Sequence, residues 1–409
     1  MAAGGGQPDH AGAAAPGPVG LAVLHRSRAS RARGAMISES LLQAVACPVC
    51  LEPGGCASCA RTGGHDATCA PYAARAACPC GGPDKVRLAR AGAALACACC
   101  GGRYPVAEAE GWVDLVPRTS VGEVTQYADH EFHERLRVTE AEPVLSARVK
   151  ADMMRRMLGA APGETVLDLG CGAGKMALYA AQGGRRAAGL DVAPFFLARA
   201  AREVDLVRGD LRRLPFRKGS FPRAYSLDVL EHLDEPGVRE VLLEARRTLG
   251  PRGRLFVYTH AMESSRLASF QRGVNRLARR LGRAGLIDHE REAMRKSDHR
   301  NAIRSHEHFD ELCAGAGLKV AERRYYNVVF KAVVEDLGLR LFEQWRRRGP
   351  KVEAHVPPEP TARREESRPS AALMGVAHAL TWLLKLDVVL FGGVRTGPFF
   401  GLLVPRERA

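Results

Sequence analysis

The clearest pattern of apolar and polar positions runs from residue 166 to 181, where the chain reads VLDLGCGAGKMALYAA. The apolar run at its start is typical of a buried parallel strand, and KMALYAAQ has helical character. The glycines between them let the backbone turn sharply and leave room for a ligand beside it. The pattern therefore predicts a strand, a tight turn and a helix of an open α/β sheet.

Three further apolar runs carry an acidic residue near their end. RAAGLD ends at Asp191, VDLVRGD ends at Asp210, and RAYSLDVLEHL contains Asp228. Acids at the carboxyl ends of parallel strands meet at the edge where open α/β sheets bind ligands, and an acid about twenty residues after the glycine turn can bind ribose hydroxyls. A nicotinamide fingerprint would need a glycine at 175, where lysine stands.

The combination of LDLGCGAG, GLDV, GD and LDVLEHL resembles the class I S-adenosylmethionine (SAM)-dependent methyltransferases, especially the type 11 group, over residues 147–260. The resemblance implies an α/β fold with a seven-stranded, doubly wound, Rossmann-like sheet and SAM as cofactor. It implies a methionine site along Asp168, Gly170, Gly172 and Gly174, a ribose site at Asp191, an adenine site at Asp210 and Leu211, and a sulfonium site near Asp228. Each carboxylate could instead be a helix cap or a strand-end acid.

Ten of the twelve cysteines lie between Cys47 and Cys100. Two C-x-x-C knuckles, Cys47 with Cys50 and Cys97 with Cys100, can supply four thiolates to one tetrahedral zinc ion. Disulfides and a redox-active pair are the alternatives. A second metal site could use four cysteines of the intervening insert, namely Cys56, Cys59, Cys78 and Cys80.

LLQAVACPVC and LACACCGGRYPVAEAEGWVDLVP resemble the zinc-ribbon module carried by, or partnered with, several methyltransferases. This chain departs from that module by its long cysteine-rich insert. The resemblance implies a module that is structural or holds the substrate. We therefore expect a tail or mis-assigned start (1–36), a zinc-ribbon-like module (37–118), a methyltransferase core (119–330), and a helical cap, linker and closing antiparallel strand (331–409).

A basic amphipathic helix is predicted around residues 266–283 as a helical insertion. Its apolar positions recur every three or four residues, and six arginines cover the other sides: Leu267, Phe270, Val274, Leu277 and Leu281; Arg266, Arg272, Arg276, Arg279, Arg280 and Arg283. Such a helix could cap the domain, lie on an anionic membrane or contact RNA. The apolar stretch 371–391 is interrupted by His378, Lys385 and Asp387, so we expect a core or pocket-roofing helix and no transmembrane helix.

The 409 residues are 46% hydrophobic and 26% charged, with a formal net charge of +15. This excess favours anionic partners or reflects a compositional bias toward arginine. The N-terminal region lacks the pattern of a secretory signal, so we expect a cytoplasmic protein, peripheral to a membrane if the basic helix binds lipid.

Methyl transfer from a sulfonium depends chiefly on aligning the acceptor, and a base is needed only if the acceptor must lose a proton early. His232, His306, His308 and Tyr127 are the candidates, although Ser305 could simply cap a helix with His308 in its first turn. We expect SAM-dependent methylation of an O, C or N atom, with a small or lipid-like acceptor favoured. The alternatives are an RNA (tRNA or rRNA) or protein methyltransferase and a non-catalytic binding or assembly protein.

Overall fold

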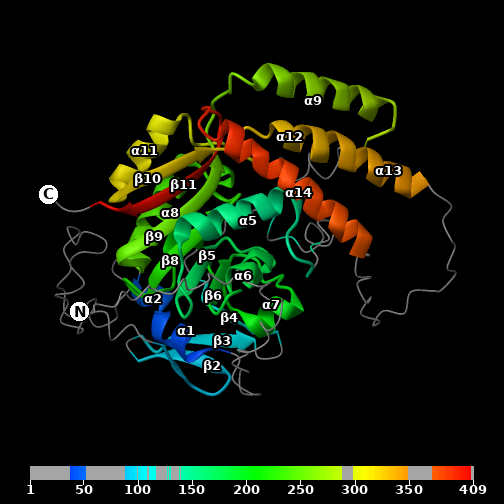
Figure 1. Cartoon of the computed structure of the whole chain (residues 1–409). Helices are drawn as coiled ribbons and strands as arrows, with labels where there is room; N and C mark the ends of the chain where they lie inside the picture. The colour runs from blue at the N-terminus through cyan, green and yellow to red at the C-terminus, as the bar shows by residue number, and fades with distance from the viewer. Residues whose placement is uncertain are drawn as a thin grey trace, which may run out of the picture. The chain divides into compact units, whose positions relative to one another are not determined.

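The computed structural model describes residues 37–51, 88–98, 100–107, 110–116, 127, 129, 138, 140–287, 298–348 and 371–406. Within these ranges one hydrogen-bonded sheet has the strand order β1-β2-β3-β4-β7-β6-β5-β8-β9-β11-β10 (Figure 1). The tail 1–36, the insert cysteines 56, 59, 78 and 80, and the linker 349–370 lie outside the described residues.

The methyltransferase part of the sheet contains seven strands among the described residues. They are β5 (Thr165–Leu169), β6 (Arg186–Asp191), β7 (Asp205–Arg208), β8 (Phe221–Leu227), β9 (Leu249–His260), β10 (Leu318–Tyr325) and β11 (Pro398–Pro405). Strands β5 to β9 are parallel, and β11 lies antiparallel between β9 and β10. The predicted seven-stranded sheet and its closing antiparallel strand are confirmed.

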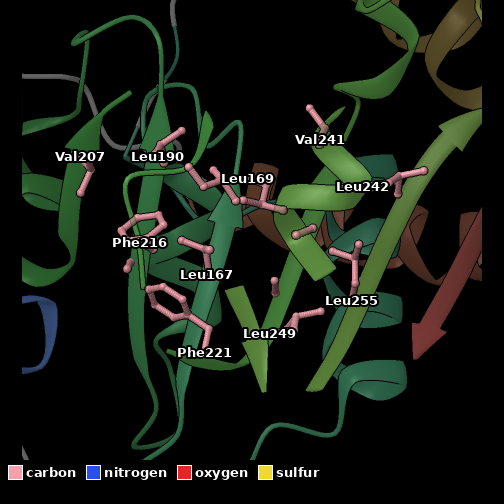
Figure 2. Close-up of a cluster of buried hydrophobic side chains, with 14 of the residues drawn as sticks. Leu167, Leu169, Leu190, Val207, Phe216, Phe221, Val241, Leu242, Leu249 and Leu255 are labelled. Atoms are coloured by element: carbon pink, nitrogen blue, oxygen red, sulfur yellow. The ribbon is translucent and has the colours of Figure 1, made fainter. Parts of the chain in front are cut away.

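Helices cover both faces of this sheet. They are α5 (Leu145–Leu158), α6 (Lys175–Ala180), α7 (Ala198–Glu203), α8 (Glu235–Thr248) and α11 (His306–Gly315), with short 3-10 turns at η4 (Leu211–Arg213) and η5 (Leu230–His232). Neighbouring residues of one strand belong to different cores, because side chains alternate across a sheet. Val166 and Phe256 pack in a cluster with α5, whereas Leu167 and Leu255 pack in the cluster with α8 that Figure 2 shows. The doubly wound arrangement is therefore confirmed.

The cysteine-rich segment is joined to the sheet. It contains α1 (Glu39–Ala44), α2 (Pro48–Leu51), β1 (Leu88–Arg90), β2 (Ala94–Cys97), β3 (Arg103–Ala107) and β4 (Trp112–Asp114). Strand β4 pairs in parallel with β7, with Val113 opposite Val207. The Ser38 hydroxyl also donates a 2.5 Å hydrogen bond to Asp205. The small module predicted from the sequence is thus a lateral extension of the methyltransferase sheet.

A second group of helices lies on the side of the molecule away from the cysteine-rich strands (Figure 1). It contains α9 (Ala268–Arg283), α12 (Val329–Lys331), the π-helix η6 (Ala332–Leu339), α13 (Arg340–Arg348) and α14 (Ala371–Phe391). By length and composition, the segment Ala372–Phe391 is apolar enough to cross a membrane, with a mean hydropathy of 1.6. Only 17% of its apolar window is buried. This exposure does not fit the expected core helix, and the expectation that no helix crosses a membrane stays a prediction.

Candidate active site

The glycine turn between β5 and α6 has the backbone shape that its sequence predicts. Gly170 and Gly174 both have a φ of 80°. A Cβ atom at Gly170 would lie 2.5 Å from Val229, and one at Gly174 would lie 2.8 Å from Ala200, so both positions exclude a side chain. Gly172, with a φ of 50°, has no atom within 4 Å of such a Cβ. The turn is therefore packed at its two ends and open at its centre, where a ligand can approach the backbone.

Asp191 connects the end of β6 to this turn. Its Oδ2 accepts a 2.7 Å hydrogen bond from the Gly172 amide, and its Oδ1 accepts one of 3.1 Å from Ala193. Asp210, by contrast, caps η4, since its Oδ1 accepts a 2.9 Å hydrogen bond from the Arg212 amide, while its Oδ2 pairs with the Arg212 side chain. The helix-cap alternative is thus realised at Asp210, and Leu211 begins the capped turn. The ribose and adenine roles of these residues stay predictions.

Asp168 lies beneath the turn with an exposure of only 2%. Its Oδ2 accepts a 2.7 Å hydrogen bond from the Tyr225 hydroxyl. Burial raises the pKa of Asp168 to about 8, although the bond from Tyr225 opposes the rise, and nearby Asp191 adds to it. At neutral pH this side chain is therefore mostly protonated.

A cavity of about 890 Å³ opens beside the carboxyl ends of β8 and β9. Half of its lining residues are acidic, basic or histidine: Lys150, Asp228, Glu231, His232, His260, His299, Lys331, Glu335, Asp336, Arg340 and Glu343. The polar side chains Gln271 and Asn275 of α9 also line it. Its wall is suited to a polar molecule of the size that protein pockets commonly bind.

Backbone strain concentrates around this cavity. Among the described residues, four that are not glycine have a positive φ, and three of them line the cavity: Asp228 (55°), Asn301 (51°) and Val328 (50°). Such conformations cost free energy and persist where the surrounding structure imposes them, often at functional sites. Asp228 also forms an ion pair with Lys150, whose ammonium lies 4.4 Å from the centre of the Tyr258 ring.

Two of the four predicted bases, Tyr127 and His232, line the cavity, and a carboxylate orients the ring of His232. Its Nδ1 lies 2.8 Å from the Asp298 carboxylate, and its Nε2 lies 3.4 Å from the Tyr127 hydroxyl. The His299 ring packs edge-on against it, with ring centres 4.6 Å apart. An Nδ1–H that donates to Asp298 leaves Nε2 as a proton acceptor on the cavity side.

Glu231 is the buried acid of the same wall, with an exposure of 1%. Thr259 donates a 3.0 Å hydrogen bond to it, and His260 Nδ1 lies 3.3 Å from its other oxygen. Burial alone would raise the pKa of Glu231, but the hydrogen bond and charge of His260 lower it to about 2. Ligand atoms of Glu231, His232 and His299 lie within 4.8 Å of one another, so this group could also hold a metal ion.

The other two predicted bases lie away from the cavity lining. His306 is 1% exposed, donates from Nε2 to the Thr396 carbonyl at 2.8 Å, and packs against Phe399. His308 is in the first turn of α11, where its amide donates to the Ser305 cap at 3.1 Å. Their contacts are those of fold-stabilising residues, and the capping alternative for His308 is confirmed.

Sequence reasoning missed several residues of the cavity wall. They come from α5 (Lys150), η5 (Glu231), β9 (Tyr258 and His260) and a loop that carries His299 and its neighbour Asp298, which contacts His232. Only Glu231 and His260 had a local signal, since both follow apolar strands at the expected sheet edge. Asp298 and His299 stand in a loop without periodicity, so no pattern could have indicated them.

The four predicted zinc ligands converge. Cys47 Sγ lies 3.5 Å from Cys100 Sγ, and Cys50 Sγ lies 3.8 Å from Cys97 Sγ. All four sulfur atoms lie within 4.8 Å of one another, and the described cysteines form no disulfide. Sulfur atoms bound tetrahedrally to zinc at about 2.3 Å lie about 3.8 Å apart, so this arrangement fits such an ion.

Residues 167–257 match a family model described as a methyltransferase domain. The chain is also 34% identical over 99 residues to an uncharacterized methyltransferase of Synechocystis, covering 24% of this chain and 47% of that protein. It is 31% identical over 115 residues to a sterol 24-C-methyltransferase of Gibberella zeae, covering 26% and 30%. The chain thus spans less than half the length of these relatives.

Among solved structures, phosphoethanolamine N-methyltransferase 2 of Haemonchus contortus, in complex with SAM, is 17% identical and has a TM-score of 0.42. That alignment covers 79% of this chain and 72% of the other. The family match contains the glycine turn, Asp191, Asp210, Asp228 and the strands that position them. Residues 167–257 therefore form a methyltransferase domain, and the prediction of a class I SAM-dependent methyltransferase core is confirmed.

Proposed function

We propose that the protein transfers the methyl group of SAM to a polar small molecule or to the polar head of an amphiphile. The observation that carries this proposal is the position of the cavity relative to the glycine turn. Asp228 lines the cavity, and the next residue, Val229, packs directly against Gly170. An acceptor in the cavity would therefore lie beside a cofactor bound at the turn.

The residues of the turn suit SAM. Asp191 offers carboxylate oxygens for ribose hydroxyls, and the open side of Gly172 leaves space along the backbone. When bound, SAM supplies an electrophilic methyl group with a neutral thioether as leaving group. The protein's task is then to align the acceptor and exclude competing water.

For an acceptor with an acidic O–H group, His232 is the proposed base. Its Nε2 would take the proton, while the acceptor oxygen forms a bond to the methyl carbon and the carbon–sulfur bond breaks toward sulfur. Asp298 stabilises the imidazolium that results, because its carboxylate lies 2.8 Å from Nδ1. Lys150 and Tyr258 offer further polar contacts for positioning the acceptor.

The chemistry of the cavity narrows the acceptor class. Sterol methyltransferases are among the similar proteins, which supports a lipid-like acceptor. The ionisable wall argues for a polar reacting end, since burying this many charged groups against hydrocarbon would be costly. A phenol, an alcohol or a lipid head group can combine a lipid-like molecule with a polar reacting end.

The test is a transfer assay with SAM labelled in its methyl group. Purified protein is incubated with pooled phenols, alcohols and amphiphiles, and with RNA and protein in parallel reactions. We expect label in a small-molecule fraction, and a His232→Gln variant that loses transfer but still binds SAM. Label only in RNA or protein would support the polymer alternative, and SAM binding without any transfer would support a binding protein.

A structural zinc ion at Cys47, Cys50, Cys97 and Cys100 is part of the same proposal. Its support is the fit of the four sulfur positions to a tetrahedral site. The ion would stabilise strands that continue into the methyltransferase sheet through β4 and β7. It would have no part in methyl transfer.

A further inference from the structure

Helix α9 exposes part of its apolar stripe: Phe270 and Leu277 face outward, whereas Leu267, Val274 and Leu281 are half-buried. Phe270 and Leu277 are each 46% exposed, whereas the buried positions are the small residues Ala268 and Ala278. Gln271 and Asn275 of the same helix line the cavity. The helix therefore borders the polar cavity with these two side chains and leaves Phe270 and Leu277 largely exposed.

Helix α14 also exposes apolar side chains, and it does so over a longer surface. Apart from His378, its exposed large side chains are apolar: Leu373 (40%), Val376 (57%), Trp382 (70%), Leu386 (39%), Val389 (74%) and Leu390 (58%). Between α9 and α14 along this side of the molecule, η6 and α13 add exposed Val333 and Phe342 (Figure 1). Exposed apolar patches of this kind mark interaction surfaces.

Several contacts hold α14 against the rest of the protein. Thr381 accepts a 2.8 Å hydrogen bond from the Leu145 amide at the start of α5, and Lys385 forms a 2.7 Å ion pair with Asp152. The buried Asp387 accepts hydrogen bonds from the first amides of α12. These contacts hold the C-terminal half of α14 against the protein, which favours a helix that lies on the surface over one that leaves it to span a bilayer.

The charge on the surface that carries α9 and α14 indicates which kind of partner this surface can bind. All six arginines between residues 264 and 287 are exposed, this segment contains no acidic residue, and within the described chain none of the six lies in an ion pair. A second copy of a chain with net charge +15 would bring like charges together. RNA would pair with the arginines but leave Phe270, Leu277 and the face of α14 in water. An anionic bilayer accommodates both features, because lipid phosphates bind arginine and the interface buries apolar side chains.

We propose that α9 and α14 form a docking surface for an anionic lipid bilayer, with both helices lying in the plane of the interface. Because Gln271 and Asn275 of α9 line the cavity, docking places the cavity next to the lipid head groups. This inference goes beyond the methyl-transfer activity and does not depend on it.

Co-sedimentation of the purified full-length protein with vesicles tests the proposal. We expect binding to phosphatidylcholine vesicles that contain phosphatidylglycerol, weak binding to pure phosphatidylcholine, and release as salt is raised from about 0.1 M to about 0.5 M. Equal binding to both vesicle types, or to neither, would overturn the proposal.

Two sets of variants separate the contribution of the arginine charges to vesicle binding from that of the exposed apolar side chains. The triple variant Arg272→Gln, Arg276→Gln, Arg279→Gln should bind anionic vesicles about 100-fold more weakly, from about fivefold per arginine. The variant Phe270→Ser, Leu277→Ser, Trp382→Ser should also lose binding, at any salt concentration. The matched controls are three exposed arginines elsewhere, Arg186, Arg202 and Arg252, changed to glutamine, and the exposed Leu243 changed to serine.

Circular dichroism and SAM titration verify that each variant is folded. Loss of vesicle binding in the arginine set but not in the apolar set would show that charge alone attracts the protein to lipid, and would overturn the proposal that the apolar side chains enter the interface. Dimerisation that the apolar set abolishes, without vesicle binding, would overturn it in favour of a second copy.

Discussion

The Asp298 carboxylate lies 2.8 Å from Nδ1 of His232, and this contact determines which nitrogen of the ring faces the cavity. The two residues are far apart in sequence and come from η5 and a loop. Their pairing gives one of three predicted histidine bases the geometry of an oriented proton acceptor. The other two, His306 and His308, have partners that belong to α11 and its packing.

The first prediction concerns this pair. His232→Gln should lower kcat by about 10²- to 10⁴-fold for an acceptor with an acidic proton, without changing SAM affinity. Asp298→Asn should reduce kcat less, because the base remains but its imidazolium loses a charged partner. The measurement is kcat as a function of pH, with His378→Gln as the control at an exposed histidine. Unchanged kcat in His232→Gln would remove this residue from the mechanism.

The second prediction concerns pH and Asp168. Its pKa is about 8 in the folded protein and about 3.9 in the unfolded chain. The folded state therefore holds an extra proton between these values, and the free energy of unfolding should fall as pH rises from about 4 to about 8, by an amount on the order of a few kcal/mol. Asp168→Asn keeps an acceptor for Tyr225 and should remove this part of the slope.

Urea unfolding at a series of pH values measures this slope. Tyr225→Phe provides a second comparison. This variant loses the hydrogen bond that lowers the pKa of Asp168, so that pKa should rise. The free energy of unfolding should then go on falling to a higher pH than in the wild type. Identical pH dependence in the wild type and Asp168→Asn would show that this carboxyl does not change its protonation on folding.

The third prediction distinguishes two glycines of the turn. Gly170→Ala places a methyl group against Val229 and should destabilise the fold itself. Gly172→Ala meets open space and should cost only the backbone strain, roughly 1–2 kcal/mol. If SAM occupies that space, Gly172→Ala should nevertheless bind it far more weakly. Thermal unfolding and SAM titration on both variants check this, and normal SAM binding by Gly172→Ala would place the cofactor elsewhere.

The fourth prediction concerns the cysteine cluster. Metal analysis of the purified protein should find zinc, and Cys97→Ser should lose it, together with several degrees of thermal stability. Stability should fall because β4 of this segment pairs with β7 of the core sheet. Cys313→Ala, at a buried cysteine outside the cluster, should keep its zinc. A protein without zinc would leave the four thiols as a metal-free core.

The sheet was predictable because its signals are local. Continuous apolar runs mark β5 to β8, glycines mark the turn, and acids mark the strand ends. The pairing of Val113 with Val207 was not predictable, since it joins segments almost a hundred residues apart, and their sequences do not specify a partner. For that reason the cysteine-rich part was expected as a separate module.

The orientation of α9 was also beyond the sequence. Periodicity gives the position of the stripe through Phe270 and Leu277 but not what the stripe faces. In the fold the stripe is divided: Leu267, Val274 and Leu281 are half-buried, while Phe270 and Leu277 are exposed. The cavity itself depends on loop residues such as His299 and Asn301, which only the folded chain brings beside β8 and β9.

The central claim is that the glycine turn binds SAM, and calorimetric titration tests it most directly. Wild-type protein is titrated with SAM and, in parallel, with NADH, and the same is done for Asp191→Ala and Asp191→Asn. We predict micromolar binding of SAM, no binding of NADH, and a loss of about 100-fold or more in Asp191→Ala from two hydrogen bonds of about 1.5–3 kcal/mol each. Tighter binding of NADH than of SAM, or unchanged SAM affinity in Asp191→Ala, would contradict the account.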